Sequence, residues 1–425
     1  MLPHRTSHQP IVSLLRTLEK GLTRYGLLPH DGKASTDRSF VWVAHDEDIE
    51  IESLRVRARF GGSASTDCRS HRVKGSGVML QGTEDYFSRQ TKYDGFALNQ
   101  AFERALVCAL PSDEDAPGHL HAAMRHAVLN GGKRIRPRLM IATAEACFGR
   151  PLEEDEAELV LRAAIAVELI HSASLVHDDL PCFDDADLRR GKPTVHKVYS
   201  VPLAVLAGDA LITQAFEIIA DYEGKHQRRA LQLARILARA TGSQRGIIGG
   251  QSLELAPQDN GMSMEFVEDY HEKKTAALFD FSMRAAAIAT GESHEQQEHW
   301  GDVGIRLGLA FQLIDDLLDL YLDEEATGKT TGRDRALQRP NGALVEGSNE
   351  TVKRLSRLID EACGQVFELA RKPDPVLRLM ESFDSMLMKV EISGGHAGEA
   401  GAPKESRNAA QSGIFTARVA AAAVG

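Results

Sequence analysis

The residues best suited to chemistry are two runs of aspartates, each placed at the end of an apolar stretch. The first run holds five aspartates within the ten residues 178–187 and directly follows the apolar segment 161–176. Ionised carboxylates gathered on a partly buried surface repel one another, so a cation must accompany them. Magnesium is suited to this role because it binds one or two carboxylates together with substrate phosphates. The run therefore predicts a metal site that handles phosphate.

The second run, Asp315, Asp316 and Asp319, lies towards the end of another apolar segment. Residues 315 and 319 are four apart, so their carboxylates share one face of a helix. Alone, such a run is more often a solvated helix end. Two runs facing each other across a cavity could hold several metal ions with a diphosphate between them. The metals would neutralise the charge that builds on a departing diphosphate, as the ionisation of an allylic diphosphate requires.

Spacing alone does not decide which aspartate accompanies Asp178. On an ideal helix Asp185, seven residues on, aligns with Asp178, whereas Asp184 does not. Pro181 interrupts the helix between them, so ideal spacing does not apply there. Both Asp184 and Asp185 stay candidates, and Asp179 lies beside Asp178.

The elements that must position these runs are predicted to be helices. From about residue 93 to 393, apolar residues recur at spacings of three and four, as in 157–176, 201–219 and 303–322. Gly and Pro fall mostly between these periodic segments. The pattern predicts an all-α catalytic domain over residues 93–393.

The two flanks lack this periodicity. Residues 1–92 are turn-rich, and we predict a largely disordered N-terminal extension in which Met79 is a candidate for the biological start. The first 30 residues carry Arg and His with almost no acids, which hints at a transit peptide, but no amphipathic repeat supports one. Residues 394–425 are rich in Gly, Ala and Ser and are predicted to form a flexible tail.

Composition narrows the possible partners. A net charge of -11 argues against nucleic acid and anionic membranes, although basic side chains can still converge locally on an anionic substrate. No stretch approaches the roughly 18 uninterrupted apolar residues of a transmembrane segment. The five cysteines are scattered and form no CxxC pair, as expected of free thiols in a reducing, cytoplasmic location.

The run from Asp178 to Lys192 resembles the first aspartate-rich motif of the polyprenyl synthetases, in its bacterial and plant form with two extra residues. Asp315–Asp319 resembles the second motif. Gly131–Pro137, Gly246–Gln251 and Lys274–Thr275 match further landmarks in the family's order. The resemblance implies the isoprenoid-synthase fold, a helical bundle around a deep central cavity, usually a homodimer. It also implies about two or three Mg²⁺ ions per active site.

Position by position, the resemblance also implies roles. The implied metal ligands are Asp178, Asp179, Asp184, Asp185, Asp315 and Asp319, and Asp316 joins them as a catalytic residue. The allylic diphosphate would meet Arg189, Lys274, Thr275 and Lys329, with Arg189 and Lys274 also catalytic. The isopentenyl diphosphate pocket would contain Lys133, Arg136, His171 and Arg190, and Gln312 would lie near the growing chain. Arginine forks clasp phosphate oxygens and lysines add point charge, which suits these roles.

Simpler explanations exist for some of these residues. Arg189 or Arg190 could pair with the adjacent aspartates, and His171 could be a core histidine. The chain also departs from the family at two places. Arg339 stands at the usual lysine in a loop of different sequence, and Glu254 replaces a more common aspartate.

The resemblance implies the reaction as well. The allylic diphosphate ionises, isopentenyl diphosphate attacks the cation, and the departing diphosphate takes the proton, while apolar walls exclude water. Family members that stop at farnesyl diphosphate tend to carry an aromatic ring where this chain has Ala173, beside Ser174. Small residues allow longer products, so we predict geranylgeranyl diphosphate, made from dimethylallyl, geranyl or farnesyl primers. Alternatively, deeper residues end the chain and Ala173 is only a packing choice.

Three other functions stay open. The first is a farnesyl diphosphate synthase. The second is a terpene cyclase or a head-to-head synthase, but these lack an isopentenyl diphosphate site such as Gly131–Pro137 provides. The third is a non-catalytic partner subunit of another prenyl synthase, but such subunits typically lose the aspartates that this chain keeps.

Overall fold

The computed structural model describes residues 93–256, 263–321 and 339–381, all of which belong to one compact unit. The predicted extension 1–92, the candidate start Met79, the tail 394–425 and Lys329 lie outside the described residues.

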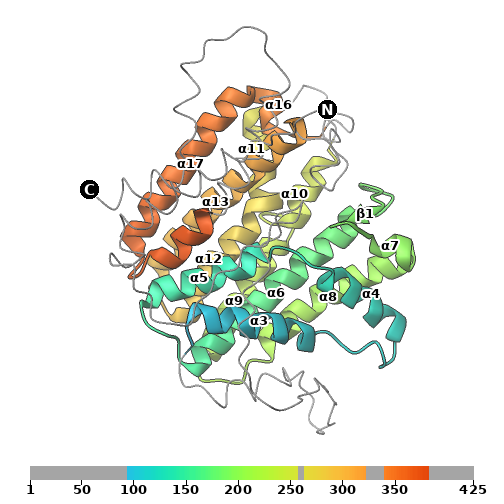
Figure 1. Ribbon diagram of the computed structural model, residues 1–425, viewed down its shortest axis with the longest axis horizontal. Coiled ribbons are helices and arrows are strands. Elements are labelled where there is room, and N and C mark those ends of the chain that lie inside the picture. Colours follow the sequence, from blue (N-terminus) through green and yellow to red (C-terminus); the bar gives the residue numbers. More distant parts are fainter. Residues whose placement is uncertain (1–92, 257–262, 322–338, 382–425) are drawn as a thin grey trace, which may run out of the picture. The chain divides into compact units, whose positions relative to one another are not determined.

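The described chain is helical almost throughout, as predicted (Figure 1). In chain order the helices are α3 (Gly95–Ala109), α4 (Gly118–Leu129), α5 (Ile135–Phe148), α6 (Glu154–Asp178), α7 (Val195–Val198), α8 (Val201–Ala220), α9 (Gln227–Thr241), α10 (Ile247–Glu254), α11 (Met264–His271), the π-helix η1 (Glu272–Ala276), α12 (Ala277–Thr290), α13 (His294–Tyr321), α16 (Gly342–Glu346) and α17 (Ser348–Leu369). Strands β1 (Leu188–Arg189) and β2 (Lys192–Pro193) form a small antiparallel hairpin.

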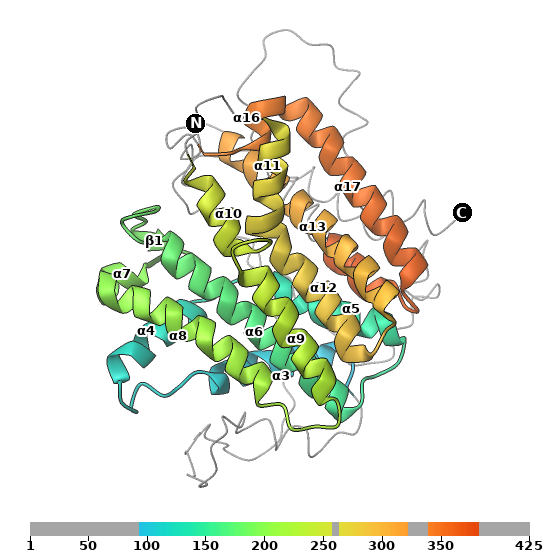
Figure 2. The same ribbon diagram turned by 180° about the vertical axis from the view of Figure 1, so that it is seen from behind.

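Helix α6 carries the first acidic run out of the core. It begins with a capping box, in which Glu153 and Glu156 each accept a hydrogen bond from the backbone N–H of the other. Residues 159–170 are buried all around the helix, since α6 packs against α3, α5, α8 and α12 (Figure 2). The helix ends at Asp178, so the aspartates begin where the chain leaves this core.

Helix α13 carries the second run and belongs to a second apolar cluster. Its residues Trp300, Val303 and Leu307 are fully or almost fully buried and pack with residues of α12 and α17. Gly308 lets α13 approach η1 closely, because a Cβ there would lie 2.4 Å from Cα of Ala276. The middle of α13 thus lies against η1.

Among the described residues, two helices are long and apolar enough to pass a test for membrane spans by length and composition, although neither is an uninterrupted apolar run. The tested window of α6 is 83% buried and that of α8 is 39% buried. Core helices of soluble proteins pass the same test, so this is weak evidence for a membrane. What it does show is that α8 keeps an exposed apolar face, which includes Val201, Val205 and Leu206.

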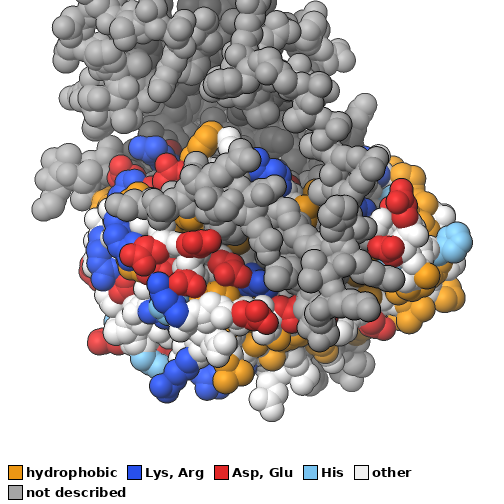
Figure 3. Space-filling model, turned by 90° about the horizontal axis from the view of Figure 1, so that it is seen from below, with side chains coloured by type: hydrophobic (Ala, Val, Ile, Leu, Met, Phe, Trp, Pro, Cys, Tyr) orange, Lys and Arg blue, Asp and Glu red, His pale blue; other side chains and the backbone are white. Residues whose placement is uncertain are grey.

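Charged side chains of both signs are interspersed on the face seen in Figure 3.

Candidate active site

The first acidic run folds back over the end of α6. The N–H of Asp184 donates to the carbonyl of Asp178 (2.9 Å), and the N–H of Ala186 donates to that of Asp179 (3.2 Å). Burial raises the pKa of Asp178 to about 6, Lys274 opposes the shift, and the nearby carboxylates of Glu254 and Asp184 add to it. The positive charge near the end of α6 is therefore not sufficient to keep the pKa of Asp178 at its ordinary value.

The structure separates the two candidates for the companion of Asp178. The Asp184 side chain is 17% exposed, whereas that of Asp185 is 60% exposed. Asp185 adopts a left-handed conformation (φ 43°), and its carboxylate lies near Lys197 (3.5 Å) and His196 (3.8 Å). The exposed position of Asp185 therefore favours Asp184 as the aspartate that accompanies Asp178.

Asp179 is buried and paired with Arg189. Nε of Arg189 donates to Oδ1 (3.0 Å) and lies 3.3 Å from Oδ2. Burial raises the pKa of Asp179, and the hydrogen bonds from Arg189 oppose the shift. A metal role for Asp179 and a phosphate role for Arg189 would both require this pair to open.

Glu254, at the end of α10, is a buried carboxylate that gathers polar partners. It accepts hydrogen bonds from Nζ of Lys274 (2.6 Å) and from the hydroxyl of Tyr270 (2.9 Å). Nε of Arg339 lies 3.6 Å from Glu254, and the same guanidinium donates to Asp184. Glu254 thus holds Lys274 and Arg339 next to the first acidic run.

The π-helix η1 presents two of the predicted diphosphate-binding residues. A Cβ at Gly250 of α10 would lie 2.4 Å from the backbone N of Lys274, so only glycine allows this approach. Lys274 reaches Glu254, and the adjacent Thr275 donates to Oε1 of Gln312 on α13 (2.6 Å). A π-helix at a functional site is a recurrent feature, and this one connects α10 with α13.

Within the second run, Asp316 is 1% exposed and has several partners. It accepts hydrogen bonds from Nε2 of Gln312 (3.0 Å) and from the backbone N–H of Gly342 (2.6 Å). Nε2 of His271 lies 3.6 Å away, but burial lowers the pKa of His271 to about 3, so the ring is neutral and this approach is not an ion pair. Asp316 therefore anchors the start of α16.

A cluster of basic side chains lies near the start of α5. Burial lowers the pKa of Arg136 to about 10, although Glu168 opposes the shift, and burial together with nearby arginines lowers the pKa of His171 well below its usual value. Among the described residues, Nε of Arg136 is buried without a hydrogen-bond partner. Arg190 donates to the carbonyl of Gly131. An anion bound here would relieve this excess of positive charge.

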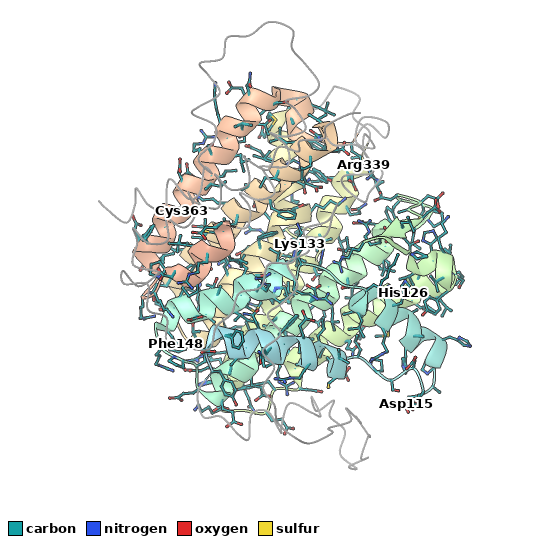
Figure 4. All side chains as sticks on the ribbon, viewed as in Figure 1. Asp115, His126, Lys133, Phe148, Arg339 and Cys363 are labelled. Atoms are coloured by element: carbon teal, nitrogen blue, oxygen red, sulfur yellow. The ribbon has the colours of Figure 1, made fainter. Side chains whose placement is uncertain are left out.

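Two further basic residues lie on different parts of the chain (Figure 4). Lys133 is exposed just before α5, and Arg339 lies just before α16. The structure thus groups Arg136, Arg189 and Arg190 around His171 and places Arg339 beside Asp184.

Sequence reasoning missed a buried ion pair beside this cluster. Nη1 of Arg134 lies 2.6 Å from Oε1 of Glu168, and Nη2 donates to the carbonyl of Val128 (2.8 Å). The pair leaves Glu168 less able to balance the charge of Arg136. Its members are 34 residues apart, and only the left-handed backbone of Arg134 (φ 50°), after two glycines, marks the turn.

The predicted chain-length residues lie on α6 before Asp178. Ala173 is fully buried, and the hydroxyl of Ser174 donates to the carbonyl of His171 (2.9 Å). A small pocket that is open to solvent lies between α4, α6 and the β1–β2 hairpin, and its lining includes Ser172 and Arg190 but not Ala173.

The donor set fits magnesium rather than a transition metal. Within residues 93–256, 263–321 and 339–381, no group of three or more His, Cys, Asp or Glu side chains could hold a metal ion alone. Magnesium commonly draws its remaining ligands from phosphates and water, so scattered carboxylates are sufficient. The raised pKa of Asp178 indicates a carboxylate that a cation would stabilise.

The described chain thus carries acidic residues at the ends of α6 and α13, and Lys274 and Arg339 lie beside the first of these ends. The family model described as Polyprenyl synthetase matches residues 117–378. The chain therefore belongs to the polyprenyl synthetase family.

Relatives of known name agree with this assignment. The geranylgeranyl diphosphate synthase of Cereibacter sphaeroides is 43% identical over 272 residues, which cover 64% of this chain and 90% of the relative. That of Rhodobacter capsulatus is 41% identical, with 64% and 89% covered. Geranylgeranyl pyrophosphate synthase 4 of Arabidopsis thaliana is 38% identical, with 66% and 75% covered.

Solved structures confirm the predicted isoprenoid-synthase bundle. A geranyltransferase from Helicobacter pylori, complexed with magnesium and isoprenyl diphosphate, superposes with a TM-score of 0.61 at 30% identity and covers 69% of this chain and 96% of its own. A geranylgeranyl pyrophosphate synthase gives a TM-score of 0.59 at 26% identity, with 69% and 98% covered.

Proposed function

We propose that this protein is a geranylgeranyl diphosphate synthase, a prenyltransferase that condenses isopentenyl diphosphate with dimethylallyl, geranyl and farnesyl diphosphates. The observation that carries the proposal is the placement of Lys274 and Arg339 beside the first acidic run, in a chain 43% identical to a synthase of that name. Two anionic substrates must meet in such an enzyme. The site offers basic side chains at two places, one near the end of α6 and one near the start of α5.

The allylic diphosphate is assigned to the region between α6, η1 and α13. Asp178 and Asp184, with Asp315 and Asp319, would hold about two or three Mg²⁺ ions, and bound magnesium would neutralise charge on the leaving diphosphate. The Helicobacter pylori neighbour, complexed with magnesium and isoprenyl diphosphate, supports this choice of metal. Glu254 keeps Lys274 directed towards this region, where the lysine would bind phosphate oxygens.

Isopentenyl diphosphate is assigned to the basic cluster near α5. Arg136 and Arg190 would bind its diphosphate, with Lys133 at the exposed side. His171 would act as a neutral hydrogen-bond partner, because burial and the nearby arginines lower its pKa. Arg189, once released from Asp179, would bind the allylic diphosphate together with Thr275, and Lys329 keeps the same role as a prediction.

A farnesyl diphosphate synthase is the second candidate, because a farnesyl/geranylfarnesyl diphosphate synthase from Zymomonas mobilis is 34% identical with a TM-score of 0.57. The test is to incubate the purified full chain with Mg²⁺, isopentenyl diphosphate and each allylic primer, and to size the products. We expect geranylgeranyl diphosphate from all three primers. A farnesyl product would favour the second candidate, and no elongation would contradict both.

The assembly and location are also proposals. We propose a homodimer, supported by the exposed apolar side chains of α8, since unpartnered apolar faces often mark protein interfaces. The cytoplasmic location stays a prediction. Among the described residues, the cysteines form no disulfide.

A further inference from the structure

The side chain before the first acidic run docks into a notch on α8. His177 is the penultimate residue of α6, and its ring lies over Gly208, which is buried on α8. A Cβ at Gly208 would lie 2.1 Å from Nε2 and 2.6 Å from Cδ2 of His177. The ring therefore occupies the space that any larger residue at position 208 would take.

The ring is also fixed by a polar contact. Nε2 of His177 lies 3.3 Å from the carbonyl oxygen of Val205, one turn before Gly208. A carbonyl only accepts hydrogen bonds, so this contact requires the proton of the ring to be on Nε2. The carboxylate of Asp209 lies 3.9 Å from the same nitrogen. Shape and hydrogen bonding thus select one orientation of the ring.

The backbone of the same residue closes the turn that begins the acidic run. The carbonyl of His177 accepts hydrogen bonds from the N–H groups of Asp179 and Leu180, the latter at 3.1 Å. The turn then continues to the bond between the N–H of Asp184 and the carbonyl of Asp178. His177 therefore contacts α8 with its side chain, and with its backbone it closes the turn that begins the loop carrying the aspartates.

We propose that His177, seated in the Gly208 notch, is a positioning residue that sets the direction of Asp178 and Asp184. The inference rests on the proposed role of these carboxylates in holding magnesium and diphosphate. Neither His177 nor Gly208 is assigned a contact with substrate, and their effect passes through the geometry of the α6 end. Small displacements of such groups are costly to catalysis.

The first variant adds one methyl group to the notch. Gly208→Ala should lower kcat about tenfold and raise the Mg²⁺ concentration for half-maximal rate, because the ring must leave its seat. Loss of helix propensity is no competing explanation, because alanine favours helices more than glycine does. Gly364→Ala on α17 is the matched control, since a Cβ there meets no atom within 4 Å, and it should stay within about twofold of the wild type.

A double-mutant cycle then tests the pairing itself. His177→Ala should lower kcat about tenfold, whereas His177→Gln, which keeps a donor, should retain most of the rate. The variant with both His177→Ala and Gly208→Ala should be no worse than His177→Ala alone, because the added methyl group enters space that the ring has left.

A binding measurement separates positioning from a general loss of activity. The rise in Tm on adding Mg²⁺ with inorganic pyrophosphate should fall by roughly half in Gly208→Ala and stay unchanged in Gly364→Ala. Circular dichroism checks that each variant is folded. If Gly208→Ala does not fold, the His177→Ala and His177→Gln pair carries the test alone.

The proposal is overturned if folded Gly208→Ala matches Gly364→Ala in kcat and in magnesium requirement. It is also overturned if the two single losses simply multiply in the double variant, or if His177→Ala behaves as the wild type. A wild-type protein that elongates no primer would instead overturn the proposed function, so the two failures are distinguishable.

Discussion

Individual aspartates in one short loop have different surroundings, and this difference can be measured. Asp178→Asn should lower kcat by about 100-fold or more, because the substitution removes a buried charge from the proposed magnesium site. Asp185→Asn should stay within about threefold of the wild type, since Asp185 is exposed beside Lys197. Steady-state rates with saturating Mg²⁺ compare the two directly. Equal losses would show that Asp185 also acts in the site.

A single residue is also predicted to set the length of the product. Ala173→Phe should shorten the main product from geranylgeranyl to farnesyl diphosphate, because the resemblance implies that an aromatic ring at this buried position of α6 ends the growing chain earlier. Ala173→Ser is the conservative control and should keep the longer product. Chromatography of the dephosphorylated products measures the ratio. An unchanged product from Ala173→Phe would place the floor of the cavity elsewhere.

Among the elements, the junction of α11 and η1 carries a buried neutral histidine. The pKa of His271 falls from 6.5 to about 3 on folding, mainly through burial. Below pH 6.5 the His271 ring binds a proton in the unfolded chain but stays neutral in the folded chain. The contribution of the neutral ring to the free energy of unfolding is therefore fully present above pH 6.5 and is lost as the pH falls. At pH 5 the loss amounts to about 2 kcal/mol.

Urea unfolding at pH 7.5 and pH 5 tests this expectation against His271→Gln, which stays neutral at both. The difference in unfolding free energy between the wild type and the variant should shift by about 2 kcal/mol towards the variant at pH 5. A constant difference would mean that His271 does not remain neutral in the fold.

The elements also show how far the sequence could be interpreted. Apolar residues at spacings of three and four predicted the long helices α6, α8 and α13, and in α8 the buried positions follow this period, whereas α6 is buried on all sides. The π-helix η1 and the β1–β2 hairpin were not predicted. A π-helix has no apolar period of its own, and η1 lies against Gly250 of another helix. The hairpin has only two residues in each strand.

In the candidate site, too, contacts between distant residues could not be predicted from the sequence. The sequence predicted which aspartates and basic residues would act, since their types and order resemble a family. It left the choice between Asp184 and Asp185 open, because Pro181 removes the ideal spacing and the outcome depends on backbone bonds within the loop. The pairing of Arg134 with Glu168 and the seating of His177 over Gly208 join distant residues, and no local pattern marks them.

At the scale of the whole molecule, the exposed apolar face of α8 predicts an interface between two copies. Leu206→Glu places a charge on this face, where the wild-type side chain is 52% exposed. We expect the variant to shift from dimer to monomer in light scattering coupled to gel filtration. Leu231→Glu on α9 is the matched control, because Leu231 is 72% exposed but lies outside α8, and it should stay dimeric. A monomeric wild type would contradict the homodimer.

The central claim is that two acidic helix ends, with magnesium, ionise an allylic diphosphate for attack by isopentenyl diphosphate. Its most direct measurement is a coupled assay of pyrophosphate release from farnesyl and isopentenyl diphosphates by the full chain. The account predicts Mg²⁺-dependent release matched by geranylgeranyl diphosphate and abolished by chelation. Absence of release with Mg²⁺ and both substrates present, or release that persists after chelation, would contradict it.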